Sequence, residues 1–159
     1  MWKTILLGVL IGGIAPVSAT AQDKAGDLAI IANKNSALDN VSSDELTKIF
    51  RAEKTKDSAG VRLIVTSREA GSPERAAALS GIYKMSEDEY SKYFLQATFT
   101  GLVQSPPRQL SSAAIAKSFV ASAPGGLSYV RASEADDSVK ILTVDGHAPG
   151  DPAYPLKIK

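Results

Sequence analysis

Four short runs of apolar residues alternate with longer segments in which apolar side chains recur at helical spacing. Each run has four to six residues and is bounded by polar or turn-forming residues, a pattern that predicts buried strands. The runs lie at 28–32, 61–66, 127–130 and 139–144. The predicted order is strand, helix, strand, three helices and two strands. This order favours crossover connections and a mostly parallel sheet with helices on both faces.

Serine residues mark where the four predicted helices begin. Ser42 and Ser86 are each followed three residues later by a glutamate, which is the pattern of a capping box. Ser72 precedes a proline, and proline suits the first helical position because no hydrogen bond is needed there. Either Ser111 or Ser112 caps the last helix.

Proline and glycine interrupt the pattern in two further segments. Residues 98–108 contain Gly101 and a double proline, so we expect the chain to cross here in an extended conformation. The tail, residues 147–159, is rich in proline, and we expect it to lie along the surface.

The first 21 residues read as a signal peptide. Lys3 precedes an apolar stretch, and residues 19–21 offer the small-x-small pattern of a cleavage site. The apolar run of about 13 residues is shorter than the ~20 needed to span a bilayer. We therefore expect residues 22–159 to form one periplasmic domain that does not insert into the membrane after signal cleavage.

Composition narrows the possible functions. The chain has 18 Lys and Arg against 17 Asp and Glu, so no overall charge attracts nucleic acid. It has no cysteine and one histidine, His147. A transition-metal site and a cysteine or Ser-His-Asp nucleophile are therefore not expected. We predict that the chain is not an enzyme and has no catalytic residues, metal or cofactor.

The most informative segment is 67–75, where a predicted strand passes into a predicted helix. Ligands bind at such positions in open α/β sheets, and unpaired backbone N–H groups at a helix start favour anions. Gly71 allows an oxyanion to approach the backbone, and Ser72 can donate its hydroxyl. Arg68 and Arg75 could add charge-assisted hydrogen bonds. The alternative is that Ser72 only caps its helix and that both arginines are solvated.

A second loop adds candidate ligand-binding residues. Asn33 and Ser36 are short polar side chains after the first strand. If the strands are parallel, residues 33–38 and the loop at 124–126 should meet the 67–75 segment at one edge of the sheet. Ordinary turn chemistry is the alternative for these residues. The position of Arg108 relative to this site is left open.

Several segments, in order along the chain, resemble short bacterial proteins of the phosphate ABC transporter substrate-binding family. The sequence R-E-A-G-S-P-E-R at 68–75 is similar to the family's R-x-x-G-S-x-x-R, and A-P-G-G-L-S-Y-V at 123–130 to its T-P-G-x-I-G-Y-V. The other similar segments are 31–35, 41–50, 85–86, 99–101 and 106–107.

The resemblance implies an α/β fold: a single three-layer domain over residues 22–159, with a mostly parallel sheet, similar to one lobe of a type II periplasmic binding protein. It also implies that Gly71 and Ser72, with Arg68 and Arg75, bind phosphate or a similar oxyanion. Full members of the family have two lobes, whereas residues 22–159 suffice for one. Pro73 departs from the family pattern and removes one backbone N–H from the predicted site.

The sequence thus predicts a periplasmic substrate-binding-type protein that recognises a small oxyanion at a helix start. Phosphate ABC transport is the implied context, with an ABC permease or a membrane sensor as the candidate partner. The alternative is an interaction or signalling module that has lost ligand binding. A hydrolase is the least favoured class, since no nucleophile is paired with a base.

Overall fold

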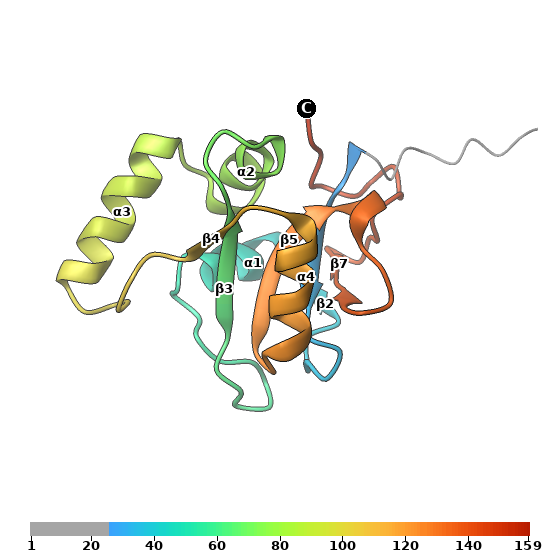
Figure 1. Cartoon of the computed structure of the whole chain (residues 1–159), viewed down its shortest axis with the longest axis horizontal. Coiled ribbons are helices and arrows are strands. Elements are labelled where there is room, and N and C mark those ends of the chain that lie inside the picture. The colour runs from blue at the N-terminus through green and yellow to red at the C-terminus, as the bar shows by residue number, and fades with distance from the viewer. Residues whose placement is uncertain (1–25) are drawn as a thin grey trace, which may run out of the picture.

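A five-stranded sheet in the order β4-β3-β5-β1-β6 is the centre of the computed structural model, which describes residues 26–159 (Figure 1). Its strands are β1 Leu28–Ala32, β3 Ile64–Arg68, β4 Arg108–Leu110, β5 Gly126–Arg131 and β6 Lys140–Ile141. Two further short strands, β2 Asn40–Val41 and β7 Thr143–Val144, form a separate parallel pair. The predicted signal peptide, residues 1–21, lies outside the described residues.

Four of the five strands run in one direction, which confirms the mostly parallel sheet. β3 is parallel to both β4 and β5, whereas β1 is antiparallel to β5 and to β6. The end of β1 pairs with Leu127, and the start of β3 pairs with Gly126. The connection 33–63 therefore begins and ends at the same edge of the sheet, so it is not a crossover and reverses the strand direction.

Helices cover both faces of this sheet. They are α1 Ser43–Phe50, α2 Pro73–Ala78, the π-helical turn η2 Leu79–Tyr83, α3 Glu87–Phe99, α4 Ala113–Ser122 and the 3₁₀ turn η3 Ala132–Glu134. The first four contribute side chains to the larger apolar core, and α4 contributes to a second core on the other face. Figure 1 shows α4 in front of the strands. The predicted three-layer α/β architecture is confirmed.

The predicted serine caps are present at all four helices. The hydroxyls of Ser42, Ser72, Ser86 and Ser112 each accept a backbone N–H from the first turn of their helix. The reciprocal capping box forms at Ser86, where the Glu89 side chain accepts the Ser86 backbone N–H. These local hydrogen bonds fix where each helix begins.

β1 is the most deeply buried strand, with all five residues inaccessible to solvent. Leu28, Ile30 and Ala32 face the larger core, while Ile31 faces the core under α4. Burying a side chain such as isoleucine contributes roughly 1.5–3 kcal/mol relative to exposure. A continuous apolar run is therefore required at this central position, because both faces of the strand are covered.

The C-terminal tail was expected on the surface, and that prediction is wrong. Tyr154 and Leu156 are buried in the larger core. The Tyr154 hydroxyl donates a 2.7 Å hydrogen bond to the Leu28 carbonyl, and the Leu28 N–H donates to the Leu156 carbonyl at 2.9 Å. Tyr154 and Leu156 thus complete the core beside the start of β1. The proline content of the tail does not reveal this contact.

Strand boundaries differ from the sequence pattern at three places. The second strand begins at Ile64 and continues to Arg68, two residues beyond its predicted end. The run at 139–144 splits between β6 and β7, because Leu142 turns into the core between them. The extended crossing at 98–108 ends in β4, which pairs with the last three residues of β3. No helix within residues 26–159 is long and apolar enough to cross a membrane.

The close approach of β3 and β5 at their starts depends on Gly125. A Cβ atom at this position would lie 1.8 Å from the Arg62 carbonyl oxygen, and the Gly125 carbonyl itself accepts the Ile64 N–H at 2.8 Å. Gly125→Ala should therefore destabilise the domain by about 2 kcal/mol or more, because backbone atoms must separate. Urea unfolding measures this. Gly26→Ala, where nothing lies within 4 Å, is the control, and equal midpoints for the two variants would contradict the prediction.

Candidate functional site

The carboxyl ends of β3 and β4 form the candidate site, at the top of the sheet in Figure 1. These strands are parallel neighbours, yet β3 leads into α2 on one face of the sheet and β4 leads into α4 on the other. A crevice opens where neighbouring strands send their helices to opposite faces. Two helix starts, at Ser72 and Ser112, therefore flank this edge.

Arg68 is the last residue of β3 and has 8% of its surface exposed. Its Nε–H donates to the Leu110 carbonyl at the end of β4, at 3.2 Å, and its backbone N–H donates to the Tyr129 hydroxyl at 3.1 Å. Its Nη1 is buried and has no hydrogen-bond partner among the described residues. A buried donor of a charged group without a partner is costly, so this nitrogen favours any acceptor that reaches it.

Gly71 and Ser72 form the exposed turn between β3 and α2. Gly71 has φ +86°, which favours glycine, and the space where a Cβ would stand is open. No hydrogen bond within residues 26–159 uses its backbone N–H. The Ser72 hydroxyl accepts the Arg75 N–H and donates to the Glu69 carbonyl at 2.9 Å. The predicted donation from Ser72 to a ligand is therefore replaced by an internal hydrogen bond.

Arg75 is fully committed to internal partners. Its guanidinium is 1% exposed, donates to Ser67 Oγ at 2.5 Å and donates to the Glu87 carboxylate at 3.2 and 2.6 Å. It also lies 4.0 Å from the centre of the Tyr90 ring. Burial alone would lower its pKa, but the hydrogen bonds to Glu87 and the nearby phenols raise the pKa of Arg75 above its ordinary value. Arg75 therefore holds the corner in place and is not free to contact a ligand.

β5 completes the support of the corner through Tyr129. The Tyr129 hydroxyl lies 2.8 Å from Ser67 Oγ, in hydrogen-bond contact, and accepts the Arg68 N–H. Both Ser67 and Tyr129 are fully buried. The path of the chain at the end of β3 is thus fixed from β5 on one side and from α3, through Glu87, on the other.

Asn33 and Ser36 do not lie at this edge, and the prediction that they converge with 67–75 is wrong. β1 is antiparallel to β5, so its end lies beside the start of β5 at the opposite edge. Asn33 Nδ2 donates to the carbonyls of Val120 and Ala121 at 2.9 and 3.1 Å. Ser36 Oγ accepts the Leu38 N–H at 3.2 Å. Asn33 stabilises the end of α4, and Ser36 shapes a turn.

The sequence interpretation did not place the start of α4 at the site. Ser111 follows directly on Leu110, whose carbonyl accepts from Arg68, and Ser112 caps the helix through the Ile115 N–H at 3.2 Å. β4 has only three residues and follows directly on a double proline. This short spacing is the one feature that could have indicated that α4 begins at the site. The adjacent Glu74 is 6% exposed and pairs with Arg131 at 2.6 Å, so its negative charge is balanced.

Two residues left open by the sequence lie away from this corner. Arg108 is the first residue of β4, two residues before Leu110, and is exposed. His147 pairs with Asp151 across 3.0 Å in the tail. Among residues 26–159, no group of three or more His, Cys, Asp or Glu side chains could hold a metal ion.

Solved structures similar to this chain include three phosphate-related proteins, while no protein-family model matches it. A phosphate transport receptor of Vibrio cholerae has a TM-score of 0.60 and 18% identity over 78% of this chain and 48% of the receptor. A putative phosphate ABC transporter substrate-binding protein of Clostridium perfringens, solved with bound phosphate, has a TM-score of 0.63 and 21% identity over 78% and 47%. PstS of Borrelia burgdorferi has a TM-score of 0.64 and 15% identity over 84% and 55%.

These similarities concern the fold. The chain spans about half the length of the three proteins that it matches. Its fold is similar to that of one lobe of a phosphate-type substrate-binding protein.

The Arg75 network predicts different effects for two neighbouring acidic residues in the first turn of α3. Glu87→Ala leaves a buried guanidinium without its carboxylate and should lower the free energy of unfolding by about 2–3 kcal/mol. Asp88→Ala removes an equivalent helix-start charge that has no such partner and should cost about 0.5 kcal/mol. Chemical denaturation of both variants tests this. Equal losses would show that the pair with Arg75 does not stabilise the corner.

Proposed function

We propose that this chain binds a small oxyanion of the phosphate class at the end of β3, as a substrate-binding-type protein and not as an enzyme. The observation that carries the proposal is the unpartnered Nη1 of the buried Arg68, at the edge where β3 and β4 diverge. The fold shared with phosphate-binding neighbours supports the same ligand class.

The chemistry of the corner suits an oxyanion. A guanidinium forms short, charge-assisted hydrogen bonds with phosphate oxygens, and its low exposure keeps competing water away. The unused Gly71 N–H offers a second donor, on a backbone that a ligand can approach closely. Pro73 supplies no N–H, so the first turn of α2 contributes fewer donors than an ordinary helix start.

Two of the remaining predicted residues, Ser72 and Arg75, have supporting parts in this proposal. Ser72 sets the start of α2, and Arg75 fixes the end of β3 through Ser67 and Glu87. Asn33 and Ser36 are not included, because they lie at the opposite edge of the sheet.

The open geometry of a single lobe implies weak binding. A pocket that encloses a small ligand buries most of its surface, whereas this corner is exposed at Gly71. Hydrogen bonds that compete with water each contribute only about 1 kcal/mol. We therefore propose that tight binding requires a second surface. In an exported, periplasmic protein, an ABC permease or a membrane sensor would supply that surface.

Thermal unfolding with added phosphate or sulfate tests the ligand site. A ligand present at ten times its Kd should stabilise the native state by about 1.4 kcal/mol and raise Tm. Arg68→Gln should abolish this rise, because it removes the unpaired charge. Arg62→Gln removes the same charge six residues earlier, before β3 begins, and should retain the rise in Tm.

Two results would contradict the proposal. One is a wild-type Tm unchanged by phosphate and sulfate up to tens of millimolar, and the other is an equal rise in wild type and Arg68→Gln. The first result would favour a docking module without a ligand, a reading for which the exposed Leu95 and Phe99 on α3 provide an apolar surface.

A further inference from the structure

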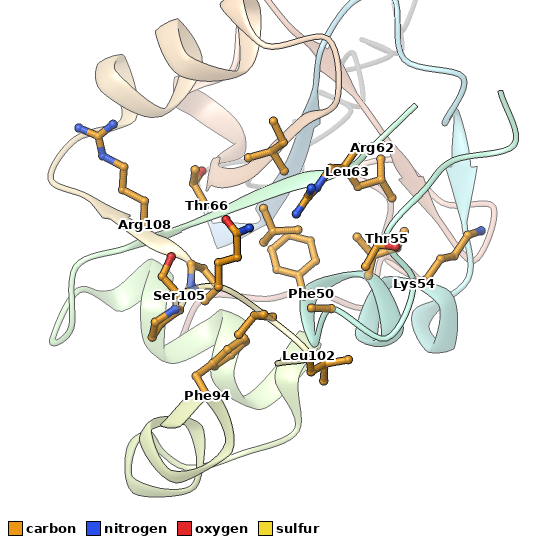
Figure 2. A pocket seen from close by; sticks show the side chains of 18 of the residues that line it. Phe50, Lys54, Thr55, Arg62, Leu63, Thr66, Phe94, Leu102, Ser105 and Arg108 are labelled. Atoms are coloured by element: carbon orange, nitrogen blue, oxygen red, sulfur yellow. The ribbon is translucent and has the colours of Figure 1, made fainter. Parts of the chain in front are cut away.

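A cavity lies at the outer edge of β3, away from the oxyanion corner. Its volume is about 520 Å³, within the range of ligand pockets. α1 and the segment after it form one wall, β3 forms the floor, and the connection between α3 and β4 forms the other wall (Figure 2). None of Arg68, Gly71 and Ser72 lines it.

The walls of this cavity present both apolar and polar surface, and the apolar part includes three phenylalanine rings. Phe50 and Phe94 belong to the core, and Phe119 comes from α4 on the other face of the sheet. Ile64 and Leu102 line the cavity with 44% and 49% of their surfaces exposed. Exposed apolar side chains around a concave surface of this size favour a ligand with an apolar body.

The open edge of β3 is too short to take an added strand. The Leu63 N–H already donates to the Thr55 carbonyl at 2.9 Å, and β4 pairs with β3 from Thr66 onward. Only Ile64 and Val65 lie between these two covers. Recognition of an extended peptide by strand addition needs a longer run of free backbone groups. A compact small molecule therefore fits the gap better than a peptide strand.

The charge of the lining is entirely positive. Lys54, Arg62 and Arg108 line the cavity, and no acidic residue does. Lys54 already pairs with Glu45, and its head group and that of Arg108 point away from the cavity in Figure 2. The Arg62 guanidinium points toward the middle of the cavity and has no hydrogen-bond or ion-pair partner among the described residues.

We infer that this cavity is a second ligand site, which takes a small amphipathic anion: an aromatic carboxylate with its ring among the apolar walls and its carboxylate on Arg62. A carboxylate matches the planar guanidinium through two parallel hydrogen bonds. Phosphate lacks the apolar body and should not compete here. The inference is independent of the oxyanion corner, because the two sites share no residue.

Titration of the wild-type protein with 2-naphthoate, followed by amide chemical shifts in NMR spectra, tests the site. We expect saturable shifts concentrated at residues 49–66 and 102–108, unaffected by 10 mM phosphate. The neutral 2-naphthamide, of the same shape, should bind about five-fold more weakly, the equivalent of ~1 kcal/mol.

Three variants locate the carboxylate contact. Arg62→Gln should weaken 2-naphthoate about five-fold and leave 2-naphthamide unchanged. Arg108→Gln, which removes an equal charge that points away from the cavity, should leave both affinities unchanged. Arg68→Gln should leave them unchanged as well, so that failure of either site is seen separately.

Three outcomes of these titrations would overturn the inference. These are shifts that do not saturate, equal affinity for the acid and the amide, and equal loss in the Arg62 and Arg108 variants. Shifts of the same residues on raising the protein concentration alone would also overturn it, because a second copy of the chain would then occupy the cavity.

Discussion

The buried guanidinium of Arg75 is the contact on which the geometry of the β3 corner depends. It joins Ser67 on β3 to Glu87 at the start of α3, and it lies against the ring of Tyr90. Since charged groups are rarely buried without partners, this network must be complete whenever the domain is folded. α2 and α3 are consequently fixed relative to the sheet, and the turn at Gly71 is held in one position.

Arg68 and Arg75 are both buried, but they differ in their hydrogen-bond partners. Every nitrogen of the Arg75 guanidinium has a partner within the fold, whereas Nη1 of Arg68 has none among the described residues. The difference arises because Arg75 faces the start of α3, with its carboxylate, and Arg68 faces the end of β4, where only a carbonyl accepts from it. In the proposed function, structural support and ligand recognition are thereby divided between two arginines seven residues apart.

β3 connects the two proposed sites, the oxyanion corner and the cavity beside Arg62. Its carboxyl end carries Arg68, and its first residues form the floor of the apolar cavity beside Arg62. β4 pairs with only the last three residues of β3, which leaves the earlier part of the strand edge open for the cavity. The small size of the domain is compatible with two separate recognition surfaces, because one short strand pairing separates them.

Features that depend on local chemistry follow from the amino-acid sequence alone. Ser42, Ser72 and Ser86 fix three helix starts through hydrogen bonds within three residues, and the fourth start was narrowed to Ser111 or Ser112. The apolar run at 28–32 requires burial on both faces. The R-x-x-G-S-x-x-R pattern at 68–75 located the corner, since strand end, turn and helix start are contiguous there.

Strand direction and the pairing of buried charges depend on contacts that form only in the tertiary structure. Because β1 is antiparallel to β5, Asn33 lies at the edge of the sheet opposite to Arg68. The partner of Arg75 is Glu87, which is twelve residues away on another helix. The core position of Tyr154 depends likewise on a contact with Leu28 at the other end of the domain. Such contacts carry no local signal, because the free energy that selects them comes from burial and hydrogen bonding between segments that meet only in the folded chain.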